Sequence, residues 1–198
     1  MPMTSNEIYP RLFLLKFDSQ FELTSTFMRL QEFYESPDAK IKNKHFTWEN
    51  FITAATCKGT INYWTFWWGF NVPGDVASKF FDLFENELTE KEKKLLTIIL
   101  PIYEKYKENF YLIGVYKEKD IIHEKAHGLF YLNPNYKKEM IKVIQSYSQK
   151  HFNELCNGLK KQGYCQEVFL DEIQAYEIDK KNKKFLRIFN KYSKLDTH

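Results

Sequence analysis

The sequence contains little glycine, proline or cysteine. Its 7 glycines and 6 prolines among 198 residues are too few for a loop-rich or disordered chain. The 3 cysteines make an odd number without a CxxC pair, which favours a reducing compartment over a disulfide scaffold. No basic segment precedes a long apolar run near the N-terminus, so we expect neither a signal peptide nor a membrane span. We therefore expect a globular, cytoplasmic protein.

A strong charge of one sign is also lacking. The 29 basic and 26 acidic residues leave a net charge of +3. This balance gives no strong indication of nucleic acid or of a membrane as a partner, because anionic partners usually select a clustered basic face. Binding of nucleic acid through lysine pairs and the basic tail (residues 179–198) is therefore the weakest of three functions considered below. The sequence gives no indication of an oligomeric state.

Aromatic residues, in contrast, are abundant, with 18 Phe, 13 Tyr and 4 Trp. They are densest in residues 60–72, where β-branched residues accompany them and predict one or two strands. So many large rings on one strand can line the floor of a groove that holds an extended peptide. The alternative is that they belong to the core, which is the commoner place for side chains that bury so much area.

The HEKAH motif at residues 123–127 is the clearest indication of chemistry in the sequence. Histidines four residues apart on a helix project from one face, so His123 and His127 can reach the same metal ion. Zinc is the ion that suits a pair of imidazoles best. Glu124 is placed to take a proton from a metal-bound water without being a ligand itself. The small residue Gly128 is expected to permit close packing beside the metal.

A catalytic zinc ion needs a third protein ligand, and its fourth position is kept for water. The acidic residues of a predicted helix at 166–178 can supply that ligand. We expect it to be Glu172, with Glu167 as the alternative, and an acidic neighbour can fix the tautomer of a ligating histidine. Tyr176 lies one turn beyond Glu172, where its hydroxyl can stabilise an oxyanion, and Tyr131 is a weaker candidate for that role.

The HEKAH motif, followed on a later helix by DEIQAY (residues 171–176), resembles the gluzincin branch of the zincin metallopeptidases. It is also similar to small uncharacterised bacterial proteins with HExAH and DExxAY motifs. The resemblance implies that His123, His127 and Glu172 bind zinc, that Glu124 is the general base, and that an edge strand receives a peptide substrate. The sequence departs from many gluzincins at Tyr176, where they have an acidic residue after the ExxA alanine.

We predict an α+β fold of the zincin-like kind, with a small mixed β-sheet packed against the motif helix and several further helices. Strands are expected at residues 9–17 and 109–116, the second at the centre of the sheet. Asp120 is expected to cap the motif helix. The chain is expected to form one domain (1–198), with a mostly sheet-bearing part (1–118), metal-binding helices (119–178) and a basic tail (179–198).

Three functions follow from these patterns. The first is a zinc-dependent hydrolase, more specifically a peptidase, that uses a metal-activated water and acts on a peptide or protein. The second is a non-catalytic, zincin-like binding module with an aromatic peptide-binding groove. The third is the nucleic-acid-binding protein. A structural zinc site formed by His151, Cys156 and Cys165 is a minor alternative, because these residues contain no tight ligand pair.

Overall fold

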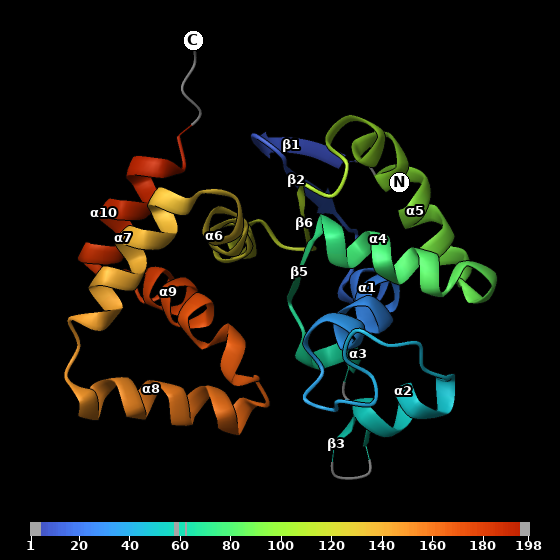
Figure 1. The fold of residues 1–198 in the computed structure, drawn as a ribbon, viewed down its shortest axis with the longest axis horizontal. Coiled ribbons are helices and arrows are strands. Elements are labelled where there is room, and N and C mark those ends of the chain that lie inside the picture. Colours follow the sequence, from blue (N-terminus) through green and yellow to red (C-terminus); the bar gives the residue numbers. More distant parts are fainter. Residues whose placement is uncertain (1–4, 58–59, 62, 195–198) are drawn as a thin grey trace.

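Two groups of helices lie on either side of a small β-sheet (Figure 1). The computed structural model describes all residues except 1–4, 58–59, 62 and 195–198. The strands are β1 (Ser5–Tyr9), β2 (Leu12–Lys16), β3 (Thr56–Cys57), β4 (Thr60–Ile61), β5 (Gly69–Pro73) and β6 (Tyr111–Val115). The α-helices are α1 (Gln20–Glu35), α2 (Trp48–Ala55), α3 (Tyr63–Phe66), α4 (Gly74–Leu83), α5 (Glu90–Tyr106), α6 (Ile121–Leu132), α7 (Pro134–Gln145), α8 (Gln149–Gln162), α9 (Phe169–Asp179) and α10 (Lys183–Tyr192). The protein is therefore an α+β protein, as the sequence predicts.

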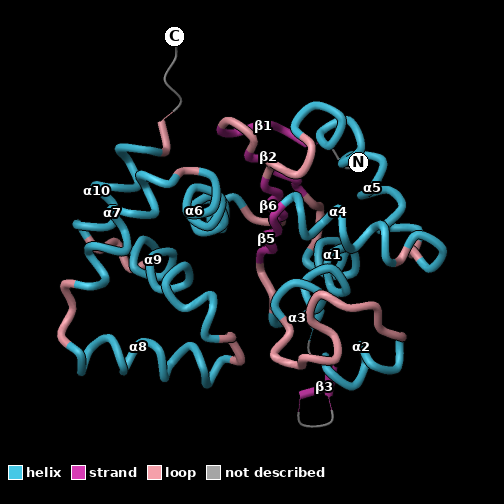
Figure 2. Tube along the Cα trace, viewed as in Figure 1, coloured by secondary structure: helices cyan, strands magenta, loops and turns pink. Residues whose placement is uncertain are grey.

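The sheet has the strand order β1-β2-β6-β5, and it is mixed. The central pair β2 and β6 is parallel, whereas β1 and β5 run antiparallel to their neighbours. The predicted strand at residues 109–116 is confirmed as the inner strand β6. Strands β3 and β4 form a separate two-stranded ribbon. Figure 2 shows β5 and β6 between α1 and α6, and β5 forms one edge of the sheet.

Both faces of the sheet are buried, because alternate side chains of a strand point to opposite faces. Phe13 and Leu15 of β2 belong to the core that the sheet shares with α1, α4 and α5. Leu12 and Leu14 of the same strand pack on the opposite face, together with Leu132 of α6. The inner strands are apolar except for the exposed Lys16 at the end of β2, because each of their faces is covered by helices.

Helix α6 lies directly against this second face. A Cβ atom added at Gly128 would lie 2.4 Å from Cδ1 of Leu12, so α6 approaches β2 too closely for any side chain at that position. Gly128 permits close packing, as expected, and the contact that requires its small size is with Leu12 of β2. The residue allows the motif helix to pack on the sheet, which places the helix at a fixed height above β5 and β6.

The helices that follow α6 form a second core of their own. Residues from α6, α7, α9 and α10 meet there, among them Ala126, Met140, Ile173 and Phe185. The basic tail contains the amphipathic helix α10, whose Phe185 and Phe189 are buried. This packing fixes α9 beside α6 (Figure 1). None of the helices in the described part of the chain is both long and apolar enough to cross a membrane.

Three local predictions are confirmed only in part. The strand predicted at residues 9–17 is present as β2, but β1 ends at Tyr9 and Arg11 adopts a positive φ of 67° in the turn before β2 begins. The aromatic segment 60–72 is not made of strands alone, since α3 separates β4 from β5. Asp120 stands at the N-cap position of α6, but its side chain makes no capping hydrogen bond. A 3-10 turn at Glu118–Asp120 leads into α6 in its place.

Candidate metal centre

The two histidines of the motif converge on one point. They lie one turn apart on α6, and their Nε2 atoms are 3.2 Å from each other. A tetrahedral zinc ion with Zn–N bonds of about 2.0–2.1 Å would hold two nitrogens about 3.3 Å apart. The separation of the two Nε2 atoms of His123 and His127 therefore suits a shared tetrahedral ion.

Helix α9 fixes the orientation of both rings. The carboxylate of Asp171 lies 2.9 Å from Nδ1 of His127. The carboxylate of Asp179, two turns further along α9, lies 2.7 Å from Nδ1 of His123. A carboxylate that accepts a hydrogen bond from Nδ1 leaves Nε2 free as a ligand atom and makes it more basic. Both Nε2 atoms are thus turned toward the same space by residues of one neighbouring helix.

Glu172 is the third member of the cluster. One ligand atom each from His123, His127 and Glu172 lies within 4.8 Å of the others, the single such group of three or more potential ligands among the described residues. Oε1 of Glu172 is 3.8 Å from Nε2 of His127. Its Oε2 is buried without any hydrogen-bond partner in the structure. A buried, unpartnered carboxylate oxygen beside two imidazole nitrogens fits a metal ligand, because such an oxygen otherwise carries a large desolvation penalty.

Burial and neighbouring carboxylates shift the pKa values of several residues in the cluster. Burial raises the pKa of Glu172 to about 7, although the neighbouring histidines act in the opposite direction. Burial would lower the pKa of His127, but the carboxylates of Asp171 and Glu172 outweigh it and hold that pKa well above its ordinary value. Burial also raises the pKa of Glu35, on α1, to about 8, and the nearby Glu172 raises it further. A divalent cation would relieve this crowding of negative charge.

Glu124, which is also on α6, faces the sheet and lines the same cavity. Its Oε2 accepts a hydrogen bond of 3.0 Å from the side-chain amide of Asn71, on β5. The amide oxygen of Asn71 in turn accepts a hydrogen bond of 2.6 Å from the hydroxyl of Tyr111. A Cβ atom at Gly69 would lie 2.2 Å from Oε1 of Glu124, so only glycine leaves room for the carboxylate there. The edge strand β5 therefore positions Glu124.

Tyr176 lies beside the histidines, whereas Tyr131 does not. The ring of Tyr176 is 5.2 Å from that of His123, and its hydroxyl lies 3.2 Å from the hydroxyl of Tyr164. The hydroxyl of Tyr131 donates a hydrogen bond of 3.0 Å to Asp75. Of the two tyrosines considered for an oxyanion, Tyr176 is the one that lines the cavity of the metal centre.

The other predicted ligands lie elsewhere. Glu167 is exposed and forms an ion pair with Lys42, so the carboxylate that the structure brings to the histidines is that of Glu172. His151 lies 3.8 Å from Glu154, and Cys165 lies 3.6 Å from Nζ of Lys42. His151, Cys156 and Cys165 form no ligand cluster in the described part of the chain.

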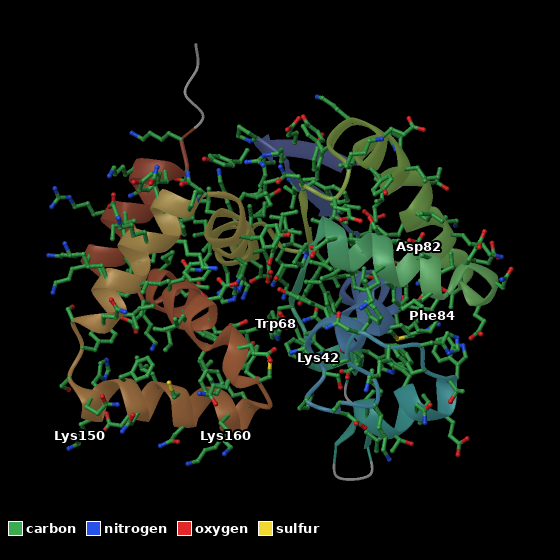
Figure 3. The ribbon with its side chains drawn as sticks, in the orientation of Figure 1. Lys42, Trp68, Asp82, Phe84, Lys150 and Lys160 are labelled. Atoms are coloured by element: carbon green, nitrogen blue, oxygen red, sulfur yellow. The ribbon has the colours of Figure 1, made fainter. Side chains whose placement is uncertain are left out.

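A cavity of about 620 Å³ gives access to the centre. The metal-ligand candidates and Glu124 line it, together with Trp67 and Trp68 from the turn before β5. Trp68 is 45% exposed and lies where the two groups of helices meet (Figure 3). In the same segment, Tyr63 and Phe70 are buried. Some rings of the aromatic segment therefore belong to the core, and others line the cavity.

Sequence reasoning missed Glu35, Gly69, Asn71 and Asp179. Gly69 and Asn71 lie within the aromatic segment with no pattern of their own, and Glu35 lies far from the motif in the chain. Asp179 lies one residue beyond the predicted helix at 166–178, whereas α9 extends to it, and its spacing of two turns from Asp171 is a signal that the sequence contains. Comparisons with protein-family models, with curated proteins and with solved structures found no match to the chain.

Proposed function

We propose that the protein is a zinc-dependent hydrolase of the gluzincin type that cleaves peptide bonds. The observation that carries the proposal is the convergence of two oriented imidazole nitrogens on a buried carboxylate oxygen that has no other partner. Two nitrogens and one carboxylate oxygen are the ligand set of a catalytic zinc site with one position left for water. The same arrangement supports a zincin-like fold, with the motif helix packed under a mixed sheet.

Each residue of the site would have its own role in hydrolysis. A bound zinc ion would lower the pKa of a coordinated water to about 7 and polarise the substrate carbonyl. Glu124 would accept the proton of the attacking water and pass it to the leaving amine. Asn71 holds the carboxylate of Glu124 by one of its two oxygens. Tyr176 would donate a hydrogen bond to the developing oxyanion.

The edge strand β5 supports a peptide as the substrate. In the described part of the sheet, β5 pairs with β6 on one side only. An extended peptide can therefore pair with its free edge by main-chain hydrogen bonds. Such a peptide would run past Gly69 and Asn71, which are the residues that hold Glu124. Its scissile bond would thus lie beside the proposed general base.

The proposal is tested by Glu124→Gln, which keeps the shape of the side chain and removes its ability to accept a proton. We expect the variant to bind zinc as the wild type does and to lose peptide hydrolysis by at least about a hundredfold. Glu167→Gln is the matched control, because Glu167 is exposed and paired with Lys42. Hydrolysis by Glu124→Gln at the wild-type rate would refute the proposal.

A second function is favoured by Trp67 and Trp68, which line the cavity. A non-catalytic module could hold a peptide on these rings, with the metal in a structural role or without a metal. Glu124→Ala separates the two functions. A binding module would keep all its peptide binding and biological activity in this variant, whereas a hydrolase would lose turnover.

A further inference from the structure

A second cavity, of about 390 Å³, adjoins the metal cavity. Both cavities share five lining residues, namely Gln31, Glu35, Trp67, Gln162 and Tyr164. The second cavity extends away from the metal centre between α1, the end of α2 and the end of α8. A ligand held at the metal centre can therefore reach into it with a side chain.

Much of the wall of this second cavity is apolar or small. Pro37, Ala54, Ala55 and the ring of Trp67 line it. The cavity holds many times the volume of a water molecule, which takes about 30 Å³ in the liquid. It is therefore large enough for a long side chain. The long aliphatic stem of a lysine or an arginine would be well accommodated between these walls, because such stems bury readily while the charged head seeks a polar partner.

Two carboxyl groups line the same cavity. Glu32 and Glu35 lie three residues apart on α1, so they project from one face of the helix. Oε1 of Glu32 accepts a hydrogen bond of 2.9 Å from the hydroxyl of Tyr63. Oε2 of Glu35 accepts one of 2.6 Å from the amide of Gln31. Both partners are neutral, and none of the described residues that line this cavity is a lysine, an arginine or a histidine.

This arrangement matches a cationic group better than an apolar one. An apolar side chain would cover the two carboxyl groups and leave them dehydrated without compensation, which is costly. Burial already raises the pKa of Glu32 above its ordinary value. An ammonium or guanidinium group would replace the lost water with charge-assisted hydrogen bonds.

We propose that the second cavity is a specificity subsite that takes a lysine or arginine side chain of the substrate, with its stem against Trp67 and its charged head between Glu32 and Glu35. The inference rests on the proposed peptide hydrolysis and names the substrate class. It also gives Glu35 a role as a specificity-determining residue at the junction of the two cavities.

The test uses two peptide libraries with blocked ends, one with lysine and one with norleucine at a fixed central position. Norleucine keeps the aliphatic stem and lacks the charge. Binding of fluorescent forms of both libraries is measured on zinc-loaded protein carrying Glu124→Gln, and cleavage by the wild type is measured separately. We expect the lysine library to bind about tenfold more tightly, which is the strength of one charge-assisted hydrogen bond.

In the same background, Glu32→Gln with Glu35→Gln should reduce this preference to about twofold or less. The single variant Glu35→Gln should give an intermediate preference, which keeps the test valid if the double variant does not fold. Glu49→Gln is the control, because Glu49 is exposed at the start of α2, and it should keep the full preference.

The outcomes distinguish the subsite from the hydrolase. Equal binding of the two libraries, or a preference that survives the loss of both carboxylates, would overturn the subsite. Cleavage of both libraries at the same rate would also overturn it and would leave the proposed hydrolysis standing. Preferential binding of the lysine library without any cleavage by the wild type would support the subsite and refute the hydrolase.

Discussion

Gly69 is the residue on which the position of Glu124 depends most. In Gly69→Ala, the new Cβ would overlap Oε1 of Glu124, from which it would lie only 2.2 Å away. The carboxylate must then move, and a displacement of about 1 Å at a reacting group can cost about a hundredfold in rate. We expect kcat/KM for peptide hydrolysis to fall by about that factor while zinc affinity stays the same. Hydrolysis at the wild-type rate would show that Gly69 does not position the base.

Asp171 orients the ring of His127, because its carboxylate lies within hydrogen-bond distance of Nδ1. Asp171→Asn weakens the hydrogen bond to Nδ1 and permits the wrong tautomer, so the imidazole becomes a poorer ligand. We expect the dissociation constant for zinc to rise about 10- to 100-fold in competition with a chelator. Asp75→Asn, which alters a carboxylate bound to Tyr131, is the control and should bind zinc normally. An unchanged zinc affinity in Asp171→Asn would contradict this role.

Glu35 makes the metal-free protein sensitive to pH. Its pKa is raised from an ordinary value of 4.5 to about 8 in the folded state. Between these values the folded state binds more protons than the unfolded state, so the free energy of unfolding falls as pH rises from about 5 to 8. Glu35→Gln removes this contribution. We measure the free energy of unfolding of Glu35→Gln by denaturation in the presence of a chelator at pH 5, 6.5 and 8. We expect it to fall less between pH 5 and 8 than that of the wild type. Parallel losses in both proteins would contradict the assignment.

Individual residues of the site were predictable only where they repeat at a helical spacing. The spacing of His123 and His127 on one helix face is fixed by the geometry of an α-helix, and that pair converges as expected. Glu172 lies on α9, whereas Glu167 lies in the 3-10 turn before it, and the packing of α9 against α6 decides which carboxylate faces the histidines. Gly69, Asn71 and Glu35 come from distant parts of the chain, and only the folded sheet brings them to the motif.

At the scale of elements, the contact of α6 with β2 holds the motif helix in place. Gly128→Ala would set a Cβ atom 2.4 Å from Cδ1 of Leu12, a fully buried side chain. Overpacking of this kind costs about 1–3 kcal/mol of stability. Gly158→Ala is the control, since Gly158 lies within α8 with no neighbour near its Cβ position. It should stabilise the protein by about 0.5–1 kcal/mol. Equal effects of both substitutions on urea denaturation would contradict the close approach of α6 to the sheet.

Elements with a local signal were predicted better than those fixed by tertiary contacts. Capping boxes begin α2 at Thr47 and α5 at Thr89, and such a box can be recognised in the sequence because it depends on residues three apart in the chain. The segment 60–72 has strand-forming residues throughout, yet α3 interrupts it where Tyr63 packs into the core. The turn at Arg11 needs a positive φ, which the residue type does not indicate.

At the scale of the whole molecule, the candidate metal centre lies between the two groups of helices. The sheet-bearing part supplies Glu35, Gly69 and Asn71, whereas α6 and α9 supply the candidate ligands. The ion pair of Lys42 with Glu167 also joins the two parts. A metal ion that binds the folded but not the unfolded protein would raise the free energy of unfolding by about 4 kcal/mol when its free concentration is about a thousand times its dissociation constant.

The central claim is that His123, His127 and Glu172 hold one metal ion. Calorimetric titration of the metal-free protein with zinc tests it most directly, with Glu172→Gln and Glu167→Gln as a matched pair. We predict one zinc ion per wild-type chain, unchanged binding in Glu167→Gln, and an affinity at least about tenfold weaker in Glu172→Gln. No saturable binding by the wild type, or equal affinities in the two variants, would contradict the account.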